Sequence, residues 1–168
     1  FSNDARFDFA IVAVPIESLS SVCLLAVDKG VERILVEKPV SLERNDLELL
    51  RAQCRGRCRI YVALNRRHYK SVMELERRLS EDGGLRQLNF SFTERLVDVE
   101  SFKHSDLERE KWGLANSIHV TDLACHLLGG VKSYSFEHKT LGAASRLWCR
   151  QPTLFSGSGV GANGALFS

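Results

Sequence analysis

The sequence is poor in the residues that dominate fibrous or disordered chains, and it has no long apolar run. Of 168 residues, 3 are proline and 12 are glycine, too few for a collagen-like or low-complexity chain. No apolar stretch approaches the roughly 18 residues of a membrane-spanning helix, and the N-terminus lacks the basic-then-apolar pattern of a signal peptide. These absences leave a globular protein of one ordinary domain or two small ones.

An excess of charge is also missing, because 23 basic side chains stand against 21 acidic ones. The balance gives no reason to expect nucleic acid or a membrane surface as a partner. Local basic clusters such as Arg66-Arg67 and Arg77-Arg78 alternate with acidic residues at helical spacing, which favours solvated helix faces over a nucleic-acid patch.

Methionine occurs once, as Met73, and the chain begins at Phe1. Because translation starts with methionine, we expect the chain to be a piece of a longer protein.

The number of cysteines is odd, and Cys54 and Cys58 lack the second pair of ligands that a zinc site needs. We therefore expect no metal, and free thiols in a reducing cytoplasm. The five cysteines are Cys23, Cys54, Cys58, Cys125 and Cys149.

The first sixty residues alternate short apolar runs with helical patterns, which predicts an α/β fold. Strands are expected over 9–14, 33–36 and 59–64, the first buried on both faces, and helices over 18–29 and 42–54. Gly30 is a natural stop for the first helix, and Ser41 is placed to cap the second or lead into it. Strand–helix–strand repeats with tight connections predict right-handed parallel crossovers, half of a doubly wound sheet.

The pattern changes after the third strand, and the remainder reads as α+β with an incomplete sheet. Helices are expected over 69–79, ended by Asp82-Gly83-Gly84, and over 118–128, ended by Gly129-Gly130. Strands are expected over 85–92 and 133–137. The segment 94–111 is polar and predicts a loop with some helix, and the chain stops at Ser168 in what should be a strand.

Polar residues follow the strands at the places where open parallel sheets bind ligands, beyond the carboxyl ends. Val14-Pro15 follows the first strand, Glu37-Lys38-Pro39 the second and Asn65 the third. The ammonium of Lys38 could hold a hydroxyl or polarise a carbonyl, and Asn65 suits sugar hydroxyls. The alternative is a surface lysine and an ordinary turn residue.

A second set of polar residues lies on the helix expected over 118–128. His119 and Asp122 are three residues apart, and His126 follows on nearly the same face. A histidine beside a carboxylate suits acid/base chemistry. The alternative is a polar pair with a structural role only.

The order of these segments along the chain is more specific than any one of them. It runs from Phe7–Val14 with Pro15, through Leu35–Pro39 and Leu64–Arg67, to Ile118–Leu123 with Leu128-Gly129-Gly130. This order resembles the Gfo/Idh/MocA family of NAD(P)-dependent oxidoreductases over nearly the whole chain. The resemblance is greatest to members of surface-polysaccharide sugar pathways.

The resemblance implies a fold and a set of roles. The C-terminal half of a Rossmann sheet would occupy 1–66, and a partial α+β domain for substrate binding and oligomerisation would occupy 67–168. Lys38 and His119 would be catalytic, and the Lys38–Pro39 bond is often cis in relatives. The remaining implied site residues are Val14, Pro15, Glu37, Lys38 and Asn65 for the cofactor, NAD or NADP, and Asn65, Arg66, Asn116 and Asp122 for the substrate.

Two positions depart from the family pattern. Many relatives carry an aspartate four residues before the histidine, where this chain has Ala115, and a histidine four residues after the proline, where it has Leu19. The family's glycine-rich nucleotide turn is also missing. The G-x-G-x-x-G at Gly159–Gly164 is followed by only Ala165–Ser168, so it predicts a hairpin or loop and not a phosphate-binding turn.

Two functions follow from this resemblance. The first is an oxidoreductase, inactive as this piece alone, that moves a hydride between NAD(P) and a hydroxyl or carbonyl of a sugar, nucleotide-sugar or polyol. Its parent would be a homo-oligomer. The alternative, which Ala115 favours, is a catalytically silent relative acting as a sugar-binding or assembly subunit.

Overall fold

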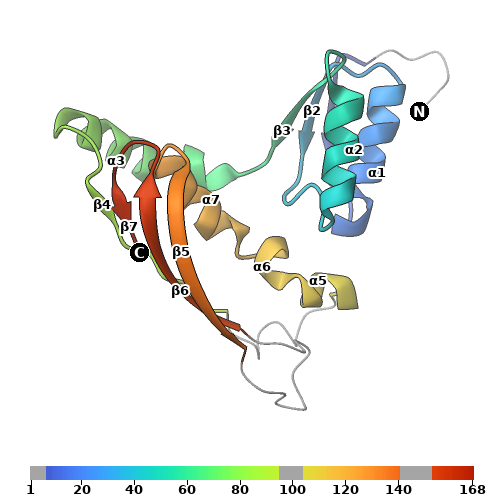
Figure 1. Cartoon of the computed structure of the whole chain (residues 1–168). Coiled ribbons are helices and arrows are strands. Elements are labelled where there is room, and N and C mark those ends of the chain that lie inside the picture. Colours follow the sequence, from blue (N-terminus) through green and yellow to red (C-terminus); the bar gives the residue numbers. More distant parts are fainter. Residues whose placement is uncertain (1–6, 95–103, 141–152) are drawn as a thin grey trace. The chain divides into compact units, whose positions relative to one another are not determined.

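The computed structural model describes residues 7–94, 104–140 and 153–168. The chain forms two compact units, Phe1–Leu64 and Asn65–Ser168 (Figure 1). The expected domain boundary after Arg66 falls within η2 (Asn65–His68), the short 3-10 helix that opens the second unit. Within the described ranges no helix has the length and apolar character needed to cross a membrane.

The first unit is a three-stranded parallel sheet in the order β1-β2-β3. Strands and helices alternate as the sequence predicts, although β1 and β3 are shorter than the apolar runs that contain them. Right-handed crossovers that step in one direction place both connecting helices on the same face of the sheet. The elements are β1 (Phe9–Val12), η1 (Ile16–Ser18), α1 (Leu19–Asp28), β2 (Arg33–Val36), α2 (Arg44–Cys54) and β3 (Arg59–Val62).

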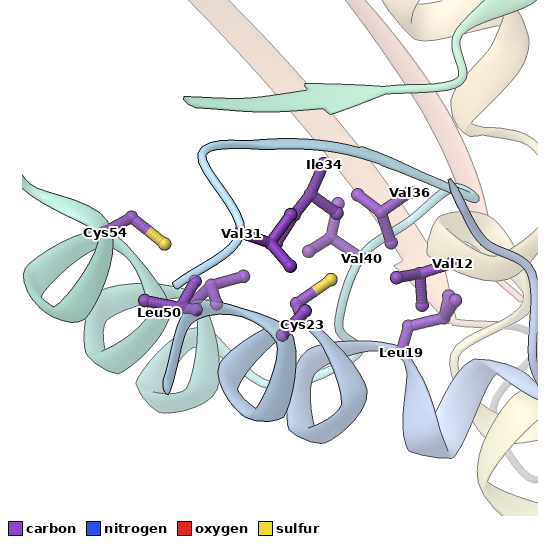
Figure 2. Packing of buried hydrophobic residues seen from close by; sticks show 11 residues of the cluster. Val12, Leu19, Cys23, Val31, Ile34, Val36, Val40, Leu50 and Cys54 are labelled. Carbon is purple, nitrogen blue, oxygen red and sulfur yellow. The ribbon is translucent and has the colours of Figure 1, made fainter. Parts of the chain in front are cut away.

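The core of this unit lies between one face of the sheet and the helices α1 and α2 (Figure 2). Leu19 from α1 and Ile34 from β2 are fully buried. Burying an aliphatic side chain of this size contributes about 1.5–3 kcal/mol. The buried members of the cluster are Val12, Leu19, Cys23, Ala26, Val27, Val31, Ile34, Val36, Val40, Leu50 and Cys54.

The opposite face of the sheet is exposed, so the expectation that the first strand is buried on both faces was wrong. Phe9 and Ile11 alternate with the inward-facing Val12 and are 45% and 68% exposed, and Tyr61 of β3 is exposed as well. An apolar run predicts a strand, but burial of both faces requires partners on both. Here α1 and α2 pack against one face only, because both crossovers have the same hand.

The expected helix ends are found, with one difference in how a serine is used. Gly30 follows α1 with a φ of +80°, and the N–H of Val31 donates to the carbonyl of Ala26 at 3.1 Å. A glycine in this left-handed conformation commonly ends a helix. Ser41 leads into α2 and does not cap it, because its hydroxyl accepts from the N–H of Glu43 at 2.9 Å and Glu43 itself is the N-cap.

The second unit contains a four-stranded sheet in the order β4-β7-β6-β5. The pair β4 and β7 is parallel, and the other two pairs are antiparallel, which agrees with the expected α+β class. The elements are α3 (Lys70–Glu81), β4 (Gln87–Leu88), α5 (Asp106–Glu110), α6 (Trp112–Ala115), α7 (Ile118–Leu127), β5 (Val131–Thr140), β6 (Thr153–Gly161) and β7 (Leu166–Phe167).

Two strands of this sheet differ in length from the prediction. The alternating segment 85–92 forms only the short β4, Gln87–Leu88, because its partner β7 is equally short. Conversely, β5 extends beyond the expected 133–137, since β6 supplies a partner along its length. A period of two predicts that a strand forms, whereas its length depends on the neighbouring strand. The segment 94–111 was expected to be a loop with some helix. Its residues 95–103 lie outside the described part of the chain, and Asp106–Glu110 form the helix α5.

The segment Gly159–Gly164 is a hairpin, as predicted, and not a phosphate-binding turn. It runs from β6 through a turn into β7. The N–H of Gly164 donates to the carbonyl of Gly161 at 3.0 Å, and Gly164 has a φ of +87°. A phosphate-binding turn opens a helix, and a strand follows here.

The clustered arginines of α3 lie on a solvated helix face, as predicted. Arg77 donates to Glu74 at 2.8 and 2.9 Å, and Arg78 donates to the same carboxylate at 2.8 Å. These hydrogen bonds, that of Arg77 first, lower the pKa of Glu74 to about 2. The positive charges of these arginines are therefore compensated by a carboxylate of the same helix.

Candidate functional site

The turn after β2 is fixed against the neighbouring strand end. The N–H of Glu37 donates to the carbonyl of Val12 at 3.0 Å, and the N–H of Val40 donates to the carbonyl of Glu37 at 3.2 Å. Between them, the Lys38–Pro39 peptide bond is cis, as the resemblance implies. The carboxylate of Glu37 is exposed and Lys38 is half-buried. The turn therefore presents a carboxylate and an ammonium at the carboxyl edge of the sheet.

Val40 closes this turn in an unfavourable backbone conformation. It has a φ of +72° and is the one non-glycine residue with positive φ in the described part of the chain. A β-branched side chain rarely adopts this region. Val40 is nonetheless buried in the core cluster, so packing of its side chain holds the strained turn in place.

The loop after β1 lies at the same edge. Val14 is half-buried and packs against the core cluster, and Pro15 is exposed. The carbonyl of Pro15 accepts the N–H of Ser18 at 2.8 Å, which forms η1. Leu19, at the position where many relatives have histidine, is a fully buried core residue, as its apolar side chain predicts.

The residues that follow β3 begin the second unit. Asn65 is exposed and Arg66 is half-buried, both in η2. The guanidinium of the next residue, Arg67, donates through Nε to Asp122 at 2.7 Å and through Nη2 to the other carboxylate oxygen. This ion pair joins η2 to α7.

The polar residues of α7 have separate partners. Asp122 accepts from Arg67, and His126 Nε2 lies 2.8 Å from Oε1 of Glu76 in α3. His119 is half-buried one turn before Asp122. In the expected row of three on one helix face, Asp122 contacts η2 and His126 contacts α3, and His119 lies in the first turn of α7.

A carboxylate that the sequence analysis missed lies beside the start of α7. Glu94 accepts from the hydroxyl of Ser117 at 2.5 Å and from the amide of Asn116 at 3.3 and 3.2 Å. Burial raises the pKa of Glu94, but hydrogen bonds from Ser117, Trp112 and Asn116 and the charge of Arg66 outweigh it, and the pKa is lowered. The sequence offered one signal for this contact, a single acidic residue after the alternating segment 85–92. Acidic residues in such places are common, so the signal was not specific.

The described cysteines are thiols, and three of them lie near one another in the first unit. Burial first, and then the neighbouring Cys54 and Cys58, together raise the pKa of Cys23 to about 11. Such a thiol stays protonated and packs as a small apolar side chain. Among the described residues no group of three or more potential ligands gathers around a metal position. Cys149 lies outside the described residues.

Solved structures match this fold over nearly the whole chain. The myo-inositol 2-dehydrogenase of Lactobacillus plantarum has a TM-score of 0.76 at 16% identity, over 98% of this chain and 50% of that one. The WlbA dehydrogenase of Bordetella pertussis, solved with NADH and UDP-GlcNAcA, has a TM-score of 0.70 at 16% identity, over 98% and 51%. An oxidoreductase of Agrobacterium radiobacter, solved with NAD+, L-tartaric acid and magnesium, has a TM-score of 0.72 at 18% identity, over 98% and 47%.

These neighbours are dehydrogenases and an oxidoreductase of the Gfo/Idh/MocA type, two of them solved with NADH or NAD+. The chain has the Gfo/Idh/MocA fold. It spans about half the length of the solved structures it matches. No protein-family model and no curated protein matches its sequence.

The carboxyl edge of the first unit offers polar and apolar groups to a ligand that carries hydroxyls, such as the ribose of a nucleotide. The Glu37 carboxylate can accept from ribose hydroxyls, the Lys38 ammonium can donate to them, and Val14 and Pro15 offer apolar contact. All four lie at the ends of adjacent strands, where open sheets bind ligands. Within the second unit, Arg66, Asn116 and His119 lie on η2 and around the start of α7.

Proposed function

We propose that the protein is an NAD(P)-dependent dehydrogenase that transfers a hydride between the nicotinamide and a hydroxyl or carbonyl of a sugar, nucleotide-sugar or polyol. The observation that carries the proposal is the Gfo/Idh/MocA fold with a lysine on the fixed turn after β2. Neighbours of this fold act on inositol or were solved with UDP-GlcNAcA, which supports a polyhydroxylated substrate.

In this proposal the first unit holds the nicotinamide end of the cofactor. Val14, Pro15, Glu37 and Lys38 would contact it, as would Asn65, which follows β3 in the sequence. The bound cofactor supplies the hydride chemistry. Lys38 would donate a hydrogen bond to the oxygen of the reacting hydroxyl, because a half-buried ammonium on a turn fixed by hydrogen bonds keeps its position.

His119 would accept the proton of the substrate hydroxyl, or return it in the reverse direction, since imidazole exchanges protons near neutral pH. Asn65, Arg66 and Asn116 would bind substrate hydroxyls or a phosphate. Asp122 is also proposed at the substrate side, but its two carboxylate oxygens already accept from Arg67. We therefore assign Asp122 a smaller direct role than the other three.

A second candidate is a sugar-binding or assembly subunit without catalysis. Ala115 is the observation that favours it, because a buried methyl group stands where many relatives carry a carboxylate and cannot move a proton. In that case Lys38 and His119 would bind ligand without turnover.

The proposed oligomer would form through the sheet of the second unit. Tyr134, Phe136 and Phe155 are 68%, 55% and 70% exposed on β5 and β6, and the rings of Tyr134 and Phe136 stack at 5.9 Å. Exposed aromatic surface of this kind favours association. Light scattering of the full-length protein tests it. A dimer or larger assembly that Phe136→Lys dissociates supports the proposal, and a monomer rejects it.

The function itself is tested on the full-length protein. Titration with NADH and NADPH, followed by calorimetry, should give saturable binding of at least one of them. Oxidation of inositol and of UDP-sugars is then followed at the nicotinamide absorbance band. Binding with turnover supports the dehydrogenase, binding of sugar without turnover supports the second candidate, and binding of neither ligand rejects both.

A further inference from the structure

A carboxylate from a distant part of the sequence holds the turn that precedes α7. Ser117 donates to Oε1 of Glu94 at 2.5 Å across 23 positions of sequence. The amide of Asn116 donates to both oxygens of the same carboxylate. Two consecutive residues of the turn therefore share one tertiary partner.

Ser117 makes this contact in place of capping the helix. It is the N-cap of α7, and a serine there usually accepts from a backbone N–H of the first turn. Here Ser117 has helical dihedral angles, φ −69° and ψ −12°, and makes no side-chain cap bond. It is buried, and its hydroxyl donates to Glu94. The start of α7 is thus located by a tertiary contact.

Glu94 carries a negative charge in this position. Burial raises its pKa, yet the hydrogen bonds from Ser117, Trp112 and Asn116 and the positive charge of Arg66 together lower it. The carboxylate also lies at the N-terminal end of α7, where the helix dipole favours a negative charge. It is therefore a strong and persistent acceptor for both donors.

His119 lies between two such anchors on α7. The Ser117–Glu94 hydrogen bond precedes it, and the Arg67–Asp122 ion pair follows it. Arg66 and Arg67 are neighbours in η2. The charge of Arg66 helps to lower the pKa of Glu94, and Arg67 binds Asp122, so one short helix contributes to both contacts. A displacement of either anchor would rotate or shift the turn that carries His119.

We propose that Glu94 is a positioning residue, which holds the Asn116–Ser117 turn and thereby sets the place and orientation of His119. The proposal rests on the proposed function, in which His119 exchanges the substrate proton. It acts through hydrogen-bond acceptance, so a side chain of the same shape that accepts from Ser117 should preserve it.

The test compares Glu94→Ala with Glu94→Gln in the full-length protein. Glutamine keeps an oxygen for the Ser117 hydroxyl, and Asn116 can turn its amide to accept from the new NH2 group. Ser117→Ala removes one bond without touching Glu94, and serves if Glu94→Ala fails to fold. Glu110→Gln is the matched control, because Glu110 is exposed on α5.

We expect Glu94→Ala to lower kcat about 10- to 100-fold, as a displaced catalytic group does, and to raise KM because Asn116 moves with the turn, with NADH affinity within about threefold. Glu94→Gln should restore most of the activity, and Glu110→Gln should match the wild type. A loss in Glu94→Gln as large as in Glu94→Ala would overturn the proposal, since charge and not contact would then matter. An unchanged kcat in Glu94→Ala and Ser117→Ala would also overturn it.

A second readout separates this proposal from the proposed function. The NMR signal of the His119 ring, assigned with His119→Gln, should move in Glu94→Ala and Ser117→Ala and stay in Glu110→Gln. If the wild type has no dehydrogenase activity, the proposed function fails and this signal alone decides whether Glu94 positions His119. A signal that stays in all variants rejects the positioning role.

Discussion

Arg67 binds both carboxylate oxygens of Asp122 through two guanidinium N–H groups. The side chain of Asp122 is only 10% exposed, and that of Arg67 is 36% exposed. Bidentate pairs of this kind add geometric specificity as well as stability. The contact joins η2, which carries Asn65 and Arg66, to α7, which carries His119, so substrate-side candidates from distant segments share one rigid connection.

Arg67→Ala should destabilise the second unit by about 1–3 kcal/mol, because it leaves a mostly buried carboxylate without this partner. Arg67→Lys should not restore stability, since an ammonium cannot form the two parallel bonds. Chemical denaturation of the chain measures both. Arg44→Ala is the control: its pair with Glu48 has side chains 89% and 62% exposed, and its loss should cost less than about 0.5 kcal/mol.

Gly159→Ala should disrupt the sheet of the second unit. An added Cβ would lie 2.3 Å from the carbonyl oxygen of Ser133 and 2.6 Å from the ring of Phe167, so backbone must move, at a cost above about 2 kcal/mol. Gly113→Ala is the matched control, because nothing lies within 4 Å of its added Cβ. It lies within α6 and should be stabilising by up to about 1 kcal/mol. Equal melting temperatures for the two variants would contradict the packing described.

Val40 offers a test of backbone strain by the order of two variants. Alanine at this position removes buried methyl groups but keeps a Cβ at a φ of +72°, whereas glycine removes the same groups and relieves the strain. Glycine is usually less stable than alanine by about 0.5–1 kcal/mol. Here we expect Val40→Gly to be at least as stable as Val40→Ala in denaturant titration. The ordinary order would mean that the turn is not strained.

The stability difference between wild type and Glu94→Gln should depend on pH. The folded state lowers the pKa of Glu94, so its stabilisation is present above the unfolded value of about 4.3 and is lost as pH falls through the folded value. We expect the difference in unfolding free energy to be constant between about pH 6 and 7 and to shrink below about pH 4. Other groups such as Glu74 titrate in both proteins and cancel. A difference in unfolding free energy that grows at low pH would mean that folding raises the pKa of Glu94.

Lys38→Ala and His119→Ala test the proposed chemistry in the full-length protein. Each should lower kcat by about 10²- to 10⁴-fold, with NADH affinity within about tenfold if only the transition state is affected. His119→Ala should also flatten the pH–rate profile near neutrality. Lys29→Ala, at an exposed residue after α1, should leave kcat unchanged. Turnover at the wild-type rate in both variants would give Lys38 and His119 a structural role.

The sequence by itself determined the fold class and most helix ends. Strands such as Arg33–Val36 appear as apolar runs, and glycines such as Gly30 end helices because a positive φ is needed there. The order of Glu37-Lys38-Pro39 and His119 predicted a fold that solved structures then matched. These features are local, so a single segment of sequence carries each of them.

Only the tertiary structure decided which polar groups meet. Asp122 with Arg67 and Glu94 with Ser117 join residues far apart in sequence, and no periodicity encodes such pairs. The exposed face of β1 and the short β4 were likewise missed, because burial and strand length depend on the neighbour that packs or pairs there. Local propensity selects the elements, whereas the partners of each side chain exist only once the elements are packed together.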